Sequence, residues 1–266
     1  FYGGASELEK TARMLRCDAV IAYMGYWLAS EVPEKKRLID ECWRLTKESL
    51  KAIEEVGDAL EYGKTYNQLS ISAFFGFFLE SDFQAREKTV GEAARYGELA
   101  IRFLSTFEDP CELARAYVRT ATCLQLFGFY FLNLDERQKY YQTAMGYWQK
   151  ANQLSEEAAM IELLNSLGMA TLENDWGWGS DEAAKNFKRA LEYGNKTKDR
   201  FIVGTALSWL ALNVSLKLGE RVLDPDEGVT LLKAALQYAE DSSNQYSLIS
   251  FVSPIWGALW VEAPLA

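Results

Sequence analysis

The chain has 266 residues, 49% of them hydrophobic, and a formal net charge of -10, so it can bury a core but lacks the positive field of a nucleic-acid scaffold. It contains no histidine, which excludes Ser-His-Asp, Cys-His and histidine-zinc chemistry. No apolar run approaches the roughly 20 residues of a membrane-spanning helix, and no polar stretch divides the sequence, so we predict a single domain over residues 1–266.

Helical periodicity is almost continuous along the chain, and no strands are expected. Asp109 and Asp224 each precede a proline and stand three residues before a glutamate, an order that is typical of a capped helix start. The predicted helices cover 6–30, 34–56, 58–80, 84–106, 110–133, 136–155, 157–174, 181–197, 199–219, 225–241 and 244–261.

One pattern recurs along alternate helices: a small residue, a larger residue four positions later, and a second small residue three positions after that. Residues at this spacing share one face of a helix, where small side chains let a neighbouring helix approach closely. The copies are Cys42/Thr46/Ser49, Ala93/Gly97/Ala100, Ala144/Trp148/Ala151, Ala183/Phe187/Ala190 and Gly228/Leu232/Ala235. The first copy is degenerate, and the Gly97 copy lacks the large central residue.

In this pattern the sequence resembles the second helix of the tetratricopeptide repeat. A leucine followed by a small residue, which resembles the first helix of that family, occurs at Leu167-Gly168 and Leu207-Ser208, and more weakly at Ile71-Ser72 and Ala121-Thr122. The repeats exceed the family's usual ~34 residues, so the chain resembles a divergent, long-repeat member. The resemblance implies an all-α fold, a right-handed α-α superhelix of about five antiparallel helix pairs. Its units would span 6–56, 58–106, 110–155, 157–197 and 199–241, followed by a terminal helix over 244–261.

The resemblance also implies a non-catalytic protein–protein interaction scaffold that binds a peptide or a partner helix in a concave groove. If Ser72, Thr122, Gly168 and Ser208 set the register, the residues three before them, one after them or a further turn away face that groove. The predicted partner-binding residues are Tyr66, Arg119, Glu162, Asn165, Thr205, Trp209 and Asn213. The polar set with which the family clamps chaperone tails cannot be placed, which favours an apolar peptide or a partner helix.

Two other classes of function stay open. The chain can be a ligand-sensing or regulatory segment of a larger signalling or transcription protein, or an all-helical enzyme that uses convergent carboxylates. The aromatic end at 254–260 offers a surface for self-association. The aromatic runs at 74–78 and 127–131 are predicted to lie in the core, or else to line a cavity for an apolar ligand.

No cofactor and no metal are predicted, because the sequence has neither a phosphate-binding glycine loop nor a metal-ligand spacing. The loop at 173–180 is rich in tryptophan and glycine but departs from the EF-hand order. Cys17, Cys42, Cys111 and Cys123 are predicted to be reduced core residues, and such unpaired thiols favour a cytoplasmic location.

Overall fold

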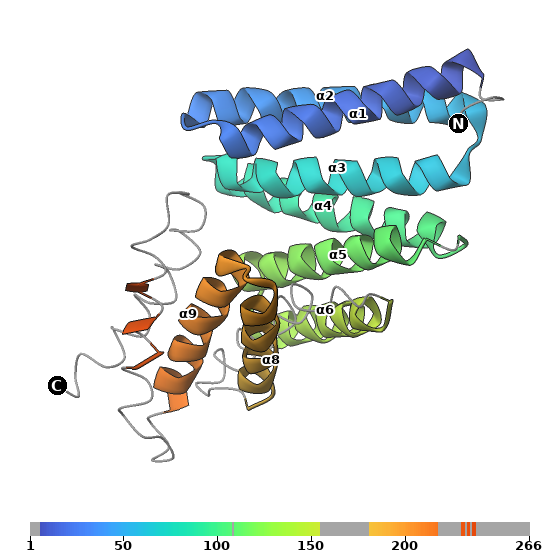
Figure 1. Ribbon diagram of the computed structural model, residues 1–266. Helices are drawn as coiled ribbons and strands as arrows, with labels where there is room; N and C mark the ends of the chain where they lie inside the picture. The colour runs from blue at the N-terminus through green and yellow to red at the C-terminus, as the bar shows by residue number, and fades with distance from the viewer. Residues whose placement is uncertain are drawn as a thin grey trace. The chain divides into compact units, whose positions relative to one another are not determined.

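The computed structural model describes residues 6–107, 109–154, 181–217 and parts of 230–237. At 129, 134, 182, 201 and 212–217 it describes the backbone alone. The regular elements in these ranges are all α-helices, which confirms the predicted all-α class there (Figure 1). They are α1 (Glu7–Leu28), α2 (Val32–Val56), α3 (Ala59–Leu79), α4 (Phe83–Leu104), α5 (Pro110–Phe131), α6 (Leu134–Leu154), α8 (Asp181–Thr197) and α9 (Arg200–Lys217). Their ends lie within about three residues of the predicted ones.

The chain divides into two compact units, Phe1–Ser155 and Glu156–Ala266. The first unit holds α1 to α6, and the described helices of the second unit are α8 and α9. The single domain over 1–266 stays a prediction. None of the helices in the described ranges combines the length and the apolar character needed to cross a membrane.

Except for α2, which has a proline in its first turn and no side-chain cap, the helices of the first unit begin where side chains satisfy the free backbone N–H groups of the first turn. Ser6 accepts from the backbone N–H of Glu9, Asp58 from those of Leu60 and Glu61, and Asp82 from that of Ala85. The predicted cap of α5 is confirmed, because Asp109 accepts a 3.1 Å hydrogen bond from the N–H of Glu112 with Pro110 between them. The corresponding signal at Asp224 lies outside the described residues.

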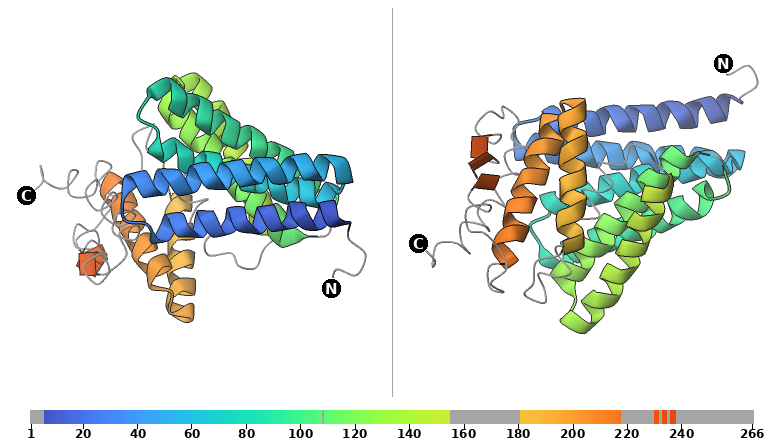
Figure 2. Two further views of the ribbon diagram at one scale, coloured as in Figure 1. Left: turned by 90° about the horizontal axis from the view of Figure 1, so that it is seen from above. Right: turned by 60° about the horizontal axis from the view of Figure 1, so that its bottom comes forward.

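Three helical hairpins, α1/α2, α3/α4 and α5/α6, build the first unit, and successive hairpins turn relative to one another (Figure 2). The first helices of the hairpins contact each other, α1 with α3 and α3 with α5, whereas no comparable contact joins α2 to α4 or α4 to α6. The row of first helices is therefore the more closely packed one.

Small buried residues recur in this unit at intervals of 51 residues, as the predicted pattern requires. The buried positions on the second helices are Cys42/Ala93/Ala144, Thr46/Gly97/Trp148 and Ser49/Ala100/Ala151, and those on the first helices are Ala12/Gly63/Ala114 and Ala19/Ser70/Ala121. At Gly97 the large residue is missing because Thr120 of α5 lies there: a Cβ on Gly97 would be 2.2 Å from the Thr120 Oγ1.

The second unit shows the same packing in its described part. Ala183, Phe187 and Ala190 of α8 are fully buried against Ile202, Ala206 and Leu210 of α9. The predicted pattern therefore faces a helix neighbour here too. The last copy, Gly228/Leu232/Ala235, lies outside the described residues, as does the predicted terminal helix over 244–261.

The cysteine prediction is confirmed at two positions and wrong at two. All four thiols are free, and Cys42 and Cys123 are buried, but Cys17 and Cys111 are exposed. Cys17 lies on a side of α1 that the described helices leave open, and Cys111 lies in the first turn of α5. Apolar neighbours in sequence therefore did not determine which side of each helix is covered.

Candidate partner-binding face

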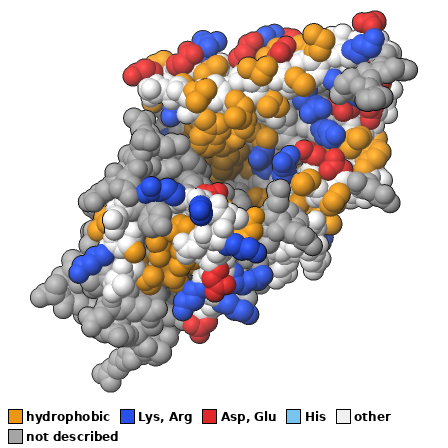
Figure 3. Space-filling model, in the orientation of Figure 1, with side chains coloured by type: hydrophobic (Ala, Val, Ile, Leu, Met, Phe, Trp, Pro, Cys, Tyr) orange, Lys and Arg blue, Asp and Glu red, His pale blue; other side chains and the backbone are white. Residues whose placement is uncertain are grey.

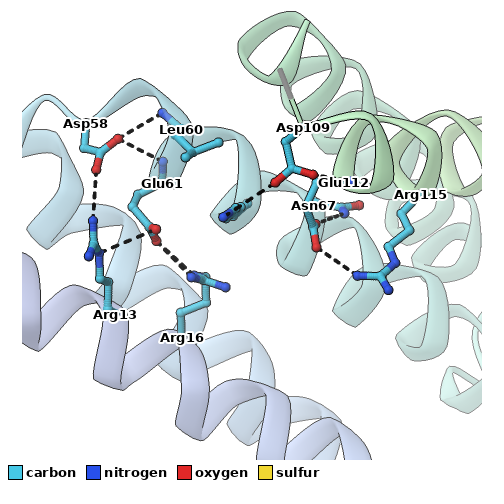
Figure 4. A network of polar contacts seen from close by, with 10 residues as sticks. Arg13, Arg16, Asp58, Leu60, Glu61, Asn67, Asp109, Glu112 and Arg115 are labelled. Atoms are coloured by element: carbon cyan, nitrogen blue, oxygen red, sulfur yellow. Dashed lines mark hydrogen bonds and ion pairs between the residues drawn. The ribbon is translucent and has the colours of Figure 1, made fainter. Parts of the chain in front are cut away.

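Paired charges join the first helices near their N-terminal ends. The Arg16 guanidinium donates to Glu61 Oε2 through Nε at 3.2 Å and through Nη2 at 3.0 Å, and Arg13 forms ion pairs of 3.5 Å with both Glu61 and Asp58 (Figure 4). The Glu61 side chain is only 6% exposed, so the two arginines, rather than water, compensate most of its charge. Arg13 also pairs with Glu9 on its own helix.

The same arrangement recurs between α3 and α5. Lys64 lies 3.9 Å from Asp109, and the Asn67 amide donates to Glu112 at 3.4 Å (Figure 4). Glu112 is also held by Arg115 at 2.9 Å. Charged groups at this end of the first helices therefore neutralise one another within the fold.

Arg119 on α5 differs from these charges. Its Nη1 atom is buried and has no hydrogen-bond partner, and within the part of the chain that the structure describes no carboxylate forms an ion pair with it. Glu112, whose charge acts on Arg119 from two turns away, is already engaged by Arg115 and Asn67. Among the residues that the structure describes, the Arg119 guanidinium therefore has no counter-charge in contact with it.

Burial dominates the electrostatics around Arg119. Desolvation lowers the pKa of the Arg119 guanidinium, and the Tyr23 hydroxyl of α1 and the Cys123 thiol act in the opposite direction. Desolvation also raises the pKa of the Cys123 thiol to about 12, so this thiol stays protonated near neutral pH. Arg119 is thus the charged member of a group that is otherwise neutral.

Aromatic rings fill the C-terminal ends of the first helices. Phe75 of α3 lies 5.0 Å from Trp27, 5.1 Å from Tyr26 and 5.3 Å from Tyr23 between ring centroids, all three on α1. The cluster continues along α3, where Phe78 contacts both Phe74 and Phe77. Phe77 in turn contacts Tyr130 and Phe131 of α5. Figure 3 shows hydrophobic side chains gathered in a hollow over the C-terminal halves of α1 and α3. We call this the aromatic hollow.

The aromatic runs are therefore only partly core. Phe75 and Phe77 are buried, as predicted, but Phe78 is 50% exposed and Tyr130 is 47% exposed. Exposed rings next to buried ones form a surface that can receive apolar side chains from a partner.

Tyr66, one of the predicted partner-binding residues, lies in a different set of rings. It stacks on Tyr62, Tyr96 and Phe103, with ring planes inclined by 16° to 19°, and so fills the space between α3 and α4. An equivalent pair, Tyr117 and Tyr147, follows 51 residues later between α5 and α6. The position of Tyr66 is that of an internal packing residue of the repeat.

The other predicted residues belong to the second unit. Thr205 is 4% exposed and its hydroxyl has no hydrogen-bond partner among the residues described, while Trp209 is half-buried against the α8–α9 core. Asn213 lies on α9, but its side chain lies outside the described part. Glu162 and Asn165 lie entirely outside the described residues.

Two grooves open between the second helices, on the side opposite the aromatic hollow. Each measures about 320 Å³; one lies between α2 and α4 over α3, and the other between α4 and α6 over α5. Lysine and glutamate side chains line both, and no buried polar group without a partner is among the lining residues. Among the residues described, no cluster of three metal-binding side chains occurs.

Some residues of this face were not anticipated from the sequence. The pairing of Arg16 with Glu61 was missed, although the recurrence of basic or amide residues and acids 45 positions apart was a signal that could have found it. Tyr23, Tyr26 and Trp27 were also missed, although the residues 51 positions later on α3 are aromatic too and could have found them: Phe74, Phe77 and Phe78.

No protein-family model matches the chain, and no curated protein is similar enough to count as a relative.

Proposed function

We propose that the chain is a non-catalytic helical-repeat scaffold whose first-helix face binds a peptide or a partner helix, and that Arg119 pairs with a carboxylate of that partner. The observation that carries the proposal is the buried Nη1 of Arg119, which has no partner in the described chain. A buried donor without an acceptor costs about 1–3 kcal/mol, more when it is charged. A partner's carboxylate would remove that cost on binding.

The aromatic hollow defines the rest of the proposed partner. Its exposed rings suit large apolar side chains, and the neutralised charges at the other end of the first helices offer no strong attraction. The proposed ligand is therefore an acidic residue close to aromatic or aliphatic residues, in a helix or an extended segment.

The proposal includes a tetratricopeptide-like fold, with a right-handed superhelix of about five helix pairs. The antiparallel hairpins and the buried small residues at 51-residue intervals support this part. The two exposed free thiols, Cys17 and Cys111, support a reducing compartment such as the cytoplasm.

A ligand-sensing or regulatory segment of a larger signalling or transcription protein is the second candidate. A small aromatic carboxylate would satisfy Arg119 and rest against the same rings, so the observation on Arg119 also favours this reading. Thermal unfolding with a panel of aryl carboxylates distinguishes the two, because only the second candidate predicts a rise in melting temperature without a peptide.

Selection from a displayed library of random peptides tests the proposal. Enriched peptides are expected to carry an acid beside large apolar residues and to lose at least tenfold in affinity for Arg119→Met. The matched control is Arg102→Met, which removes the same charge from an exposed position on α4. Enrichment of peptides without an acid, or equal binding to Arg119→Met, would overturn the proposal.

A further inference from the structure

The outer side of α1 carries a row of exposed apolar side chains that the proposed binding face does not use. Met14 is 67% exposed, Ile21 67%, Met24 56% and Leu28 86%, and Cys17 between them is exposed as well. Their spacing alternates between three and four residues, as at the a and d positions of a heptad repeat. We call these five residues the α1 stripe.

The repeat explains which side of α1 this is. Counting 51 residues on from Cys17, Ile21 and Met24 leads to Gln68, Ser72 and Phe75 of α3, which are all buried. Ser72 and Gln68 contact the Cys42 thiol of α2, and Phe75 contacts rings of α1. The α1 stripe therefore occupies the side that, in α3, the preceding helix pair covers.

The two versions of this side differ in chemistry. The buried side of α3 that corresponds to the α1 stripe includes the polar side chains of Thr65, Gln68 and Ser72. At the equivalent positions α1 has Met14, Cys17 and Ile21. Large contiguous apolar patches are rare on isolated proteins, and a helix with apolar a and d positions buries them against another helix. The α1 stripe has the composition of an interface between helices.

We propose that the α1 stripe is a dimerisation surface on which a second copy of this chain packs its own α1 in antiparallel orientation. A stripe of a and d positions is complementary to itself under a two-fold axis, because the a residues of one helix lie near the d residues of the other. This association is independent of Arg119.

Local charge supports a second copy as the occupant. The whole chain carries -10, but α1 carries little net charge outside its contact with α3. Arg13 and Arg16 pair with Glu9, Asp58 and Glu61 within the fold, and the exposed charges of α1 are those of Lys10, Glu7 and Asp18. In an antiparallel pair, the end of α1 where the exposed Lys10 pairs with Glu7 meets the end of the other copy with the exposed Glu31. The two copies thus meet without the repulsion that their net charges would otherwise cause.

Sedimentation equilibrium over a range of concentrations tests the proposal. The wild-type chain is expected to form a dimer, and Ile21→Glu and Ile21→Lys are each expected to weaken it at least tenfold while the helical circular dichroism signal is kept. An equimolar mixture of the two variants is expected to regain the dimer, because opposite charges then meet near the middle of the stripe. Gln142→Glu, an exposed change on α6, is the control and should dimerise like the wild type.

Thiol labelling gives a second readout on the unaltered chain. Alkylation of Cys17 is expected to slow as the protein concentration rises, whereas alkylation of Cys111 on α5, which is also exposed, is expected to stay constant. A chain that stays monomeric into the hundreds of micromolar, a mixture that does not regain the dimer, or labelling of Cys17 that is indifferent to concentration would each overturn the proposal. Arg119→Met is expected to dimerise normally, so this proposal and the binding proposal fail separately.

Discussion

Arg16 of α1 and Glu61 of α3 are joined by two hydrogen bonds and stand 45 residues apart, the separation that also joins Asn67 of α3 to Glu112 of α5. The two interfaces between first helices are therefore built alike, although only one of them uses an arginine. Glu61 receives both Arg13 and Arg16, which makes it the residue on which the α1–α3 contact depends most.

Glu61→Gln is expected to lower the free energy of unfolding by about 1–3 kcal/mol, because Arg16 loses its counter-charge and Arg13 loses one of its three acidic partners. Urea denaturation measures this change. Glu34→Gln, which breaks an exposed ion pair with Arg37 within one helix, is the control and should change stability by no more than about 0.5 kcal/mol. Equal effects of the two substitutions would contradict the importance of Glu61.

Gly97→Ala and Gly146→Ala are expected to have opposite effects. A Cβ at Gly97 would lie 2.2 Å from the Thr120 Oγ1 and 3.3 Å from its Cα, so the packing of α4 on α5 must shift, at a cost of about 1–3 kcal/mol. A Cβ at Gly146 in α6 meets nothing within 4 Å, and alanine there should stabilise the helix by up to about 1 kcal/mol. Thermal unfolding distinguishes them, and a gain in stability at Gly97 would contradict the close approach.

Alkaline pH is expected to destabilise the chain through its buried thiols. Burial raises the pKa of Cys123 from 9.0 to about 12, so the neutral thiol is favoured in the fold and the unfolded chain ionises first as pH rises. The contribution of Cys123 to stability is therefore complete below pH 9 and is lost between pH 9 and 12. Burial raises the pKa of Cys42 in the same direction.

Urea unfolding at successive pH values measures this loss. Stability should fall from pH 9 to pH 11 in the wild type, and it should fall less steeply in Cys123→Ala. A loss of the same steepness in the variant would show that Cys123 is not the thiol responsible.

Arg119→Met is expected to stabilise the isolated chain by about 1 kcal/mol, because an unpaired buried charge is replaced by an apolar side chain of similar length. Arg13→Met is the comparison and should destabilise the chain, because it removes ion pairs to Glu9, Asp58 and Glu61. Chemical denaturation of both variants measures the change in the free energy of unfolding. A loss at Arg119 as large as that at Arg13 would mean that the fold itself uses the Arg119 charge.

The helices and their packing positions could be predicted because local rules set them. The cap at Asp109 and the buried copies around Ala100, Ala151 and Ala190 need only periodicity and residue size, which the sequence contains. The copies fall 51 residues apart in the first unit, and Ala190 follows Ala151 by 39, so residue size and helix spacing rather than a fixed interval made the second-helix register predictable.

The first-helix register was less accessible. The sequence likeness aligns Ser72 with Thr122, but the 51-residue repeat aligns the buried Ser70 with the buried Ala121, and the half-buried Ile71 with Thr122. The alignment slipped by one residue because both neighbours in each pair are compatible with a helix interior. An error of one residue turns a helix face by about 100°, so the two alignments select groove residues on different faces of the first helices.

The exposure of Cys17, and the fact that the Arg119 Nη1 atom finds no partner within the described ranges, could not be predicted from sequence. Both depend on which side chains the neighbouring helices present, and these come from positions far along the chain. Arg115 and Arg119 look alike in sequence, yet only Arg115 has Glu112 within hydrogen-bond distance.

A double-mutant cycle between Arg119 and a selected peptide tests the binding proposal most directly. Calorimetric titration would compare the wild-type chain and Arg119→Met, each with the acidic peptide and with its amide counterpart. The proposal predicts a coupling energy of at least about 1.4 kcal/mol, which corresponds to a tenfold change in affinity. A coupling energy near zero would contradict it, because Arg119 and the carboxylate would then act independently.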